Sequence, residues 1–136
     1  MYLNAYLHFS GNCDEAFSLY EKVFGVKRLM SMTYGDSPMG AQSPPDVARK
    51  IMHTRLQVGD TLLMGSDSPP DRFQKPQGFS VNINCSSPEE ADRVFSALSD
   101  GAQITMPIQE TFWAKRFGML TDRFGQSWMV NCEKPM

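Results

Sequence analysis

The chain has 136 residues, of which 13 are basic and 15 are acidic, so its formal net charge is −2. No basic run is longer than the pair Lys27-Arg28, which argues against a nucleic-acid or anionic-membrane partner. No stretch approaches the ~20 apolar residues of a membrane span, and the N-terminus does not resemble a signal peptide. We therefore expect a cytoplasmic protein with a single domain over residues 1–136.

The chain begins with a predicted strand and a predicted helix. Residues 2–9 alternate between apolar and polar side chains, with Tyr6 and His8 on the polar face. A helix is predicted over residues 14–24, and Gly25 follows it where helices often end in a left-handed residue. Because the apolar stripe of the helix must cover the apolar face of the strand, Tyr6 and His8 are expected to face the open side of the sheet.

The pattern predicts three more strands in the first half, at residues 27–34, 50–58 and 61–66. The segment 35–45 between the first two is rich in Gly, Ser and Pro and lacks periodicity, so it is expected to be a loop and a candidate lid for a pocket. The last two strands form a hairpin about Gly59-Asp60. Their alternation places His53 and Arg55 on the face away from the helix.

The second half repeats this order after a connector at residues 68–76 that contains three prolines. The predicted elements are a strand at 78–85, a helix from a Ser87 cap to about Ser99, and strands at 103–106, 116–121 and 127–132. Asp122 is expected to organise the turn before the last strand through bonds from its side chain to the backbone.

The two halves also match residue by residue at a spacing of 75 positions. The matching pairs are Asn12 and Ser87, Glu15 and Glu90, Ala16 and Ala91, Leu19 and Val94, Tyr20 and Phe95, and Val23 and Leu98. The first two pairs predict a helix N-cap followed by a Glu three residues later, and the others form one apolar helix face. The expected class is α+β, with two tandem βαβββ repeats at about 1–67 and 77–136. They form a cupped mixed sheet with its helices on the outer face, and a shared ligand site lies between them.

Sulfur-containing residues are numerous. Cys13, Cys85 and Cys132 are far apart and show no metal-binding spacing, so we interpret them as reduced, mostly buried thiols. Ten methionines favour either gap-filling in the core or a pocket that adapts to its ligand.

Several motifs indicate a family. The βαβββ repeat, the entry to the first helix (Gly11-Asn12-x-x-Glu15-Ala16) and the turn Asp122-x-Phe124-Gly125 resemble the vicinal oxygen chelate superfamily, which includes glyoxalase I, bleomycin- and fosfomycin-resistance proteins and extradiol dioxygenases. Within it, Ile51-Met52-His53, Glu110-Thr111-Phe112-Trp113-Ala114 and the region from Phe117 to Met129 resemble the PhnB-like (YjdN-like) branch. The resemblance spans residues 6–134 and implies a glyoxalase-like fold and a homodimer.

The resemblance also implies where a metal would lie. Metal-using members hold their ion on the first and last strands of each repeat, and these positions correspond here to Asn4, Met64, Gly78 and Met129. Hard divalent ions prefer imidazole nitrogen and carboxylate oxygen, whereas a thioether suits copper(I). We therefore predict no metal ligands and no cofactor, with a divalent metal as a disfavoured alternative. The chain also lacks the glycine-rich loop of a dinucleotide-type cofactor site.

The candidate ligand-binding residues are Tyr6, His8, His53, Arg55, Glu110, Trp113 and Phe117. His53 and Glu110 are candidate acid–base groups, because imidazole titrates near neutral pH and aromatic neighbours can raise the pKa of a carboxyl group by desolvation. A purely structural role stays open for each type of residue: a histidine bonded within its sheet, a solvated arginine, an exposed loop carboxylate, or an aromatic ring that packs in the core or at a dimer contact.

Three functions follow. The leading hypothesis is a homodimeric protein that binds a small organic molecule in an aromatic-lined concave pocket without a superfamily-type metal. The first alternative is an enzyme of the same superfamily, of the lyase, transferase or dioxygenase type, that uses a metal or His53 or Glu110 as an acid or base. The second alternative is a dimeric interaction module whose pocket is filled by its own side chains.

Overall fold

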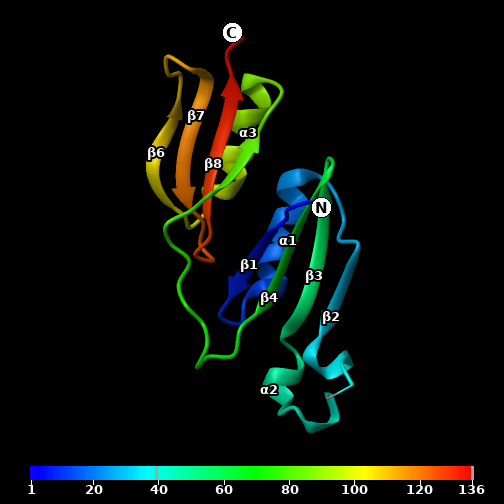
Figure 1. The fold of residues 1–136 in the computed structure, drawn as a ribbon. Helices are drawn as coiled ribbons and strands as arrows, with labels where there is room; N and C mark the ends of the chain where they lie inside the picture. Colours follow the sequence, from blue (N-terminus) through cyan, green and yellow to red (C-terminus); the bar gives the residue numbers. More distant parts are fainter. Residues whose placement is uncertain (39, 136) are drawn as a thin grey trace. The chain divides into compact units, whose positions relative to one another are not determined.

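The computed structural model describes residues 1–38 and 40–135, and the chain divides into two compact units, Met1–Gln74 (unit one) and Lys75–Met136 (unit two). Each unit contains one helix against one four-stranded mixed sheet (Figure 1). The α+β class and the two tandem βαβββ repeats are thus confirmed. In the described part of the chain, no helix has the length and apolar character needed to cross a membrane.

Unit one is built around the strand order β1-β4-β3-β2, in which β1 runs parallel to β4 and the other neighbours are antiparallel. Its elements are β1 (Ala5–Phe9), α1 (Cys13–Phe24), β2 (Met30–Thr33), the 3-10 turns η1 (Tyr34–Asp36) and η2 (Gly40–Gln42), α2 (Pro45–Ala48), β3 (Ile51–Val58) and β4 (Thr61–Asp67).

Helix α1 covers the face of this sheet that alternation predicted. Leu7 and Phe9 are buried, and the ring of Phe9 meets the ring of Phe17 edge to face with centroids 6.0 Å apart. Gly65 on β4 lets the helix approach, because a Cβ atom there would lie 2.6 Å from Cε1 of Phe17. The opposite face of the sheet is therefore left uncovered by α1.

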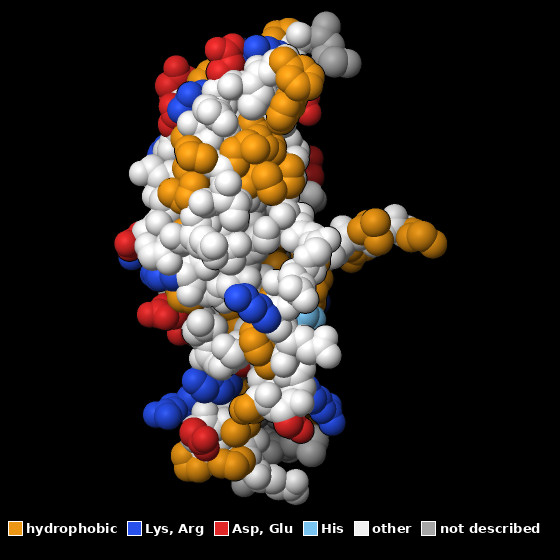
Figure 2. All heavy atoms as spheres, turned by 90° about the vertical axis from the view of Figure 1, so that its left-hand side faces the viewer, with side chains coloured by type: hydrophobic (Ala, Val, Ile, Leu, Met, Phe, Trp, Pro, Cys, Tyr) orange, Lys and Arg blue, Asp and Glu red, His pale blue; other side chains and the backbone are white. Residues whose placement is uncertain are grey.

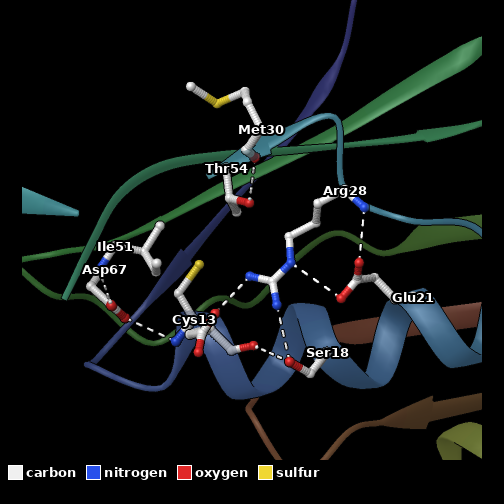
Figure 3. A network of polar contacts seen from close by, with 9 residues as sticks. Cys13, Ser18, Glu21, Arg28, Met30, Ile51, Thr54 and Asp67 are labelled. Atoms are coloured by element: carbon white, nitrogen blue, oxygen red, sulfur yellow. Dashed lines mark hydrogen bonds and ion pairs between the residues drawn. The ribbon is translucent and has the colours of Figure 1, made fainter. Parts of the chain in front are cut away.

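The N-terminus of α1 differs from the prediction, because Asn12 makes no side-chain cap. Asp67, at the end of β4, takes this role instead: its Oδ1 accepts hydrogen bonds from the backbone N–H groups of Gly11 (2.9 Å) and Cys13 (3.0 Å). Its Oδ2 accepts from the backbone N–H of Ile51 at 2.9 Å (Figure 3). Asp67 caps α1 in place of Asn12 because its carboxylate connects three segments at once: the start of α1, the start of β3 and the end of β4.

The segment predicted as a loop, 35–45, connects β2 to α2 and contains short 3-10 turns that the prediction did not include. Thr33 and Asp36 form a reciprocal capping box around η1, and the backbone at Pro44 leads into α2. These short turns lack the apolar periodicity by which longer helices are recognised. Met39, within this segment, lies outside the described residues.

Unit two has the strand order β5-β8-β7-β6, with β5 parallel to β8 and the other neighbours antiparallel. Its elements are β5 (Val81–Asn84), α3 (Pro88–Leu98), β6 (Gln103–Gln109), β7 (Ala114–Thr121) and β8 (Ser127–Glu133). β6 is longer than predicted. It accommodates Pro107, which has no N–H, because it is an edge strand with irregular register between Met106 and Gln109.

Helix α3 has the predicted cap and the predicted buried face. The Ser87 hydroxyl accepts a hydrogen bond from the Glu90 backbone N–H at 3.1 Å, and the Glu90 carboxylate accepts from the Ser86 backbone N–H. Its buried face consists of the four predicted residues Ala91, Val94, Phe95 and Leu98. A Cβ atom at Gly118 on β7 would lie 2.6 Å from Phe95, so this glycine permits close packing of the helix.

The turn before β8 is organised by Asp122, as predicted. Its Oδ1 accepts hydrogen bonds from the backbone N–H groups of Phe124 and Gln126, both at 2.9 Å. Its Oδ2 also accepts from Nε1 of the buried Trp128 at 2.8 Å, a bond that the turn chemistry did not predict.

The three cysteines are buried free thiols, as predicted. Burial raises the pKa of Cys13 and, to about 11, that of Cys85, so both remain protonated at neutral pH.

Candidate functional site

The face of the first sheet that α1 leaves uncovered carries the predicted polar residues of unit one. Register places Met64 of β4 between Tyr6 of β1 and Arg55 of β3, with Met30 of β2 beyond Arg55. His8 and His53 lie along the same strands two residues from Tyr6 and Arg55, and Met32 pairs with His53. We define this set as the first open face: Tyr6, His8, Met30, Met32, His53, Arg55 and Met64.

Three side chains of this face form a hydrogen-bonded chain. Nε of Arg55 donates to Nε2 of His53 at 3.0 Å, and Nδ1 of His53 lies 3.2 Å from the Tyr6 hydroxyl oxygen. The ring of Tyr6 also lies against both histidines, with centroids 5.2 Å from His8 and 5.7 Å from His53. The structure thus brings together four of the predicted site residues.

The direction of these hydrogen bonds fixes the protonation of His53. Arg55 Nε is only a donor, so His53 Nε2 must present a lone pair and the ring proton must lie on Nδ1. Nδ1–H then donates to the Tyr6 oxygen, and the Tyr6 hydroxyl hydrogen is left to point elsewhere. A neutral His53 therefore leaves Tyr6 able to donate to a ligand.

Partial burial, and then the positive charge of Arg55, lower the pKa of His53 below its ordinary value of 6.5. The unfolded chain then takes up this proton at a higher pH than the folded chain does. The histidine therefore contributes stability above its unfolded pKa, and this contribution is lost as the pH falls through the folded pKa.

We expect the ring protons of His53 to titrate with a midpoint below 6.5 in an NMR pH titration, with the two histidine signals assigned from a His8→Asn variant. In Arg55→Met the midpoint should rise, because both the adjacent cation and the bond that requires a lone pair on Nε2 are removed. An unchanged midpoint in Arg55→Met would contradict the hydrogen-bonded chain.

Arg55 has no carboxylate partner in the described part of the chain, unlike Arg28 and Arg116. Arg28 pairs with Asp14 and Glu21, and Arg116 pairs with Asp92. Among residues 1–38 and 40–135, no Asp or Glu lies within ion-pair distance of Arg55, and its side chain is exposed. Its terminal nitrogens are therefore available to an anion.

The other predicted site residues lie in unit two. Trp113 packs edge to face on Phe117 with centroids 5.4 Å apart, and Phe112 packs on Trp113 at 4.8 Å. Phe117 is buried, whereas Trp113 and Phe112 are 44% and 89% exposed. Exposed hydrophobic side chains gather on unit two (Figure 2, upper half); its exposed large hydrophobic residues are Phe79, Ile104, Phe112 and Trp113.

Glu110 does not have the raised pKa that its aromatic neighbours predicted. Its side chain is 68% exposed and pairs with Nζ of Lys134 at 2.9 Å. The hydrogen bond and the positive charge of Lys134 lower the pKa of Glu110. The prediction failed because Lys134 is distant in sequence and the aromatic rings do not desolvate the carboxylate.

Sequence reasoning missed one polar group, a row of asparagines on the sheet of unit two. Asn84 Oδ1 accepts hydrogen bonds from the side-chain amides of both Asn82 and Asn131, each at 3.2 Å. The alternation Asn82-Ile83-Asn84 was the available signal, and it is also typical of an ordinary solvent-facing strand.

The residues at the family's metal positions do not fit a hard divalent ion. Asn4 precedes β1 and donates to the Leu62 carbonyl, and Gly78 precedes β5, so neither is the strand neighbour of its methionine. Those neighbours are Tyr6 for Met64 and Asn82 for Met129, which offer phenol, amide and thioether donors. Within the described ranges, no three His, Cys, Asp or Glu side chains cluster as metal ligands.

Comparison with known proteins gives a consistent relationship over the whole chain. The family model described as 3-demethylubiquinone-9 3-methyltransferase matches residues 2–131. Protein YjdN of Escherichia coli K12 is 35% identical over 98% of this chain and 97% of its own length.

Solved structures agree with this relationship. Protein PA1353 of Pseudomonas aeruginosa is 46% identical, with a TM-score of 0.89 over 99% of both chains. A Bacillus cereus structure described as a putative 3-demethylubiquinone-9 3-methyltransferase, PhnB protein, is 25% identical, with a TM-score of 0.81 over 97% of this chain and 99% of its own. A Burkholderia phytofirmans enzyme of the glyoxalase/bleomycin resistance protein/dioxygenase family, 16% identical with a TM-score of 0.63 over 96% and 98% of the two chains, shares the fold.

Proposed function

Since the chain belongs to the PhnB-like family described as 3-demethylubiquinone-9 3-methyltransferase, with a glyoxalase-like fold, we propose that it binds a small organic anion on the first open face. The proposal includes a homodimer, which the family resemblance implies, and a cytoplasmic location, which the sequence analysis predicted. The methyltransferase activity in the family description is not included, because neither strand-to-helix turn of the chain contains a glycine-rich cofactor loop.

The observation that carries the proposal is the oriented cation at Arg55. Its Nε is held by His53, so the plane of the guanidinium group is fixed before a ligand arrives. A planar guanidinium with free terminal nitrogens matches a carboxylate better than an ammonium group would. Tyr6, oriented by the same histidine, supplies a second donor to the anion.

The surroundings of these donors favour an apolar body on the ligand. Met64 lies between Tyr6 and Arg55, and Met30 and Met32 flank Arg55 and His53. All three are partly exposed, so they are not simply core fillers. Thioether side chains adapt to flat or branched apolar groups, which supports a carboxylate on an aromatic or short aliphatic skeleton.

Benzoate is a suitable probe, because it combines a carboxylate with a flat apolar ring. Calorimetric titration of the native chain with sodium benzoate should give saturable binding that weakens about 10- to 100-fold in Arg55→Met and about 10-fold in Tyr6→Phe, as expected for lost charge-assisted hydrogen bonds. Arg72→Met, which removes an exposed cation from the same unit, should bind like the native chain. Equal binding by all three variants would contradict the proposal.

An acid–base enzyme is a second candidate, because the hydrogen-bonded chain can also deliver a proton. Both ring nitrogens of His53 are engaged, so the group that faces a substrate is the Tyr6 hydroxyl, with His53 positioned behind it. Glu110 is a poor acid at neutral pH, since its pKa is lowered.

A further inference from the structure

The sheet of unit two carries its asparagine row at the positions that Tyr6 and His8 occupy in unit one. Tyr6 of β1 pairs with Met64 of β4, and Asn82 of β5 pairs with Met129 of β8. Two residues further on, His8 pairs with Ser66, and Asn84 pairs with Asn131. The repeat thus keeps the scaffold and replaces the aromatic side chains of Tyr6 and His8 with the neutral amides of Asn82 and Asn84.

The hydrogen bonds within the row determine which atoms face outward. Asn84 Oδ1 accepts from Nδ2 of Asn82 and from Nδ2 of Asn131. Reversing all three amides would leave the buried NH2 group of Asn131 without that acceptor, and unpaired buried N–H groups are rarer than unpaired carbonyls. The outward atoms are therefore Oδ1 of Asn82, an acceptor, and Nδ2 of Asn84, a donor, both on exposed side chains.

Asn131 holds this row in place at a cost in folding stability. It is 7% exposed, and its Oδ1 has no hydrogen-bond partner in the part of the chain that the structure describes. An unpaired buried carbonyl destabilises a fold, because it loses its hydrogen bonds to water without gaining a partner. Core stability therefore does not explain an asparagine at this position, whereas positioning Asn84 through the hydrogen bond does.

We propose that the row of Asn82, Asn84 and Asn131 is a second binding site, specific for a neutral amide group such as a primary carboxamide, a lactam or an imide. An amide N–H of the ligand donates to Asn82 Oδ1, and its carbonyl accepts from Asn84 Nδ2. A carboxylate offers no donor to Asn82, so the site discriminates against it.

Apolar side chains flank the row on the same sheet. Met129 pairs with Asn82 and with Met119, and Phe117 pairs with Asn131. Trp113 packs on Phe117 and covers it. The ligand body therefore contacts the thioethers of Met129 and Met119 beside the amides. These residues support an amide attached to a flat apolar ring.

Benzamide is the probe for this site, and benzoate is its matched control, because the two differ only in the polar group. In ¹H–¹⁵N NMR spectra of the native chain, benzamide should shift the side-chain NH2 signals of Asn82, Asn84 and Asn131 along a saturable curve, and benzoate should not. Arg55→Met should leave these shifts unchanged, which separates this site from the proposed anion site. Failure of benzoate to bind unit one would not affect this result.

Asn84→Asp tests the outward donor. The new carboxylate still accepts from Asn82 and Asn131, so the Asn131 NH2 signal should persist while benzamide binds at least tenfold more weakly. Gln77→Glu adds the same charge at an exposed position of unit two and should bind like the native chain. If Asn84→Asp does not fold, Asn82→Leu removes the outward acceptor and should give the same loss. Benzamide shifts that are retained in the folded variant, or matched by benzoate, would overturn the proposal.

Discussion

Replacement of Asp67 with alanine should lower the free energy of unfolding of unit one by about 3–5 kcal/mol. Hydrogen bonds to a charged acceptor contribute about 1.5–3 kcal/mol each, and the contributions of one group do not add fully. Alanine would leave the backbone N–H groups of Cys13 and Ile51 buried without their acceptor and would free the Gly11 turn. Losses of this size are typical when a buried polar network is broken.

The measurement must report on unit one. Both tryptophans lie in unit two, so urea unfolding should be followed by far-UV circular dichroism, with amide hydrogen exchange at Gly11, Cys13 and Ile51 as the local readout. Asp67→Asn should cost less, because its carbonyl keeps the bonds from Gly11 and Cys13. Asp71→Ala, at an exposed position, is the control. Native-like stability and exchange in Asp67→Ala would show that the three bonds are not what holds α1 to the sheet.

The caps of the two helices show which features of the fold are local in sequence. Ser87 and Glu90 are three residues apart and act within their own helix, so the motif predicted α3 correctly. Asn12 and Glu15 have the same spacing, yet the cap of α1 comes from Asp67, more than fifty residues away. A sequence motif shows which residues are able to cap a helix. Contacts with residues distant in sequence decide which residue forms the cap.

The candidate site shows the same difference between features that are local in sequence and features that depend on distant residues. Strand alternation predicted that Tyr6, His8, His53 and Arg55 face away from the helix, because that depends only on a period of two and on the position of the apolar stripe. The hydrogen-bonded chain among them depends on the register of β1, β3 and β4, which alternation does not specify. Glu110 was misjudged for the same reason, since its partner Lys134 comes from another strand end.

Asp122 should be the corresponding weak point of unit two. Asp122→Ala removes the acceptor of two backbone N–H groups and of the indole N–H of Trp128, which is 1% exposed. We expect a loss of about 3–5 kcal/mol, because three buried donors are left without that acceptor. Asp122→Asn should be intermediate, since one amide oxygen can keep the two backbone bonds while its NH2 group faces the indole N–H.

Trp128 fluorescence in a Trp113→Phe background measures this loss in a single-tryptophan chain, with Asp100→Ala as the exposed control. An unfolding midpoint in Asp122→Ala equal to that of the control would refute the role of the carboxylate.

The same fluorescence signal tests whether the two units unfold together. If residues 1–136 fold as one cooperative domain, Asp67→Ala lowers the Trp128 midpoint, although Asp67 touches no residue of unit two through its hydrogen bonds. If each repeat unfolds alone, Asp67→Ala leaves Trp128 unaffected, and only Asp122→Ala moves it.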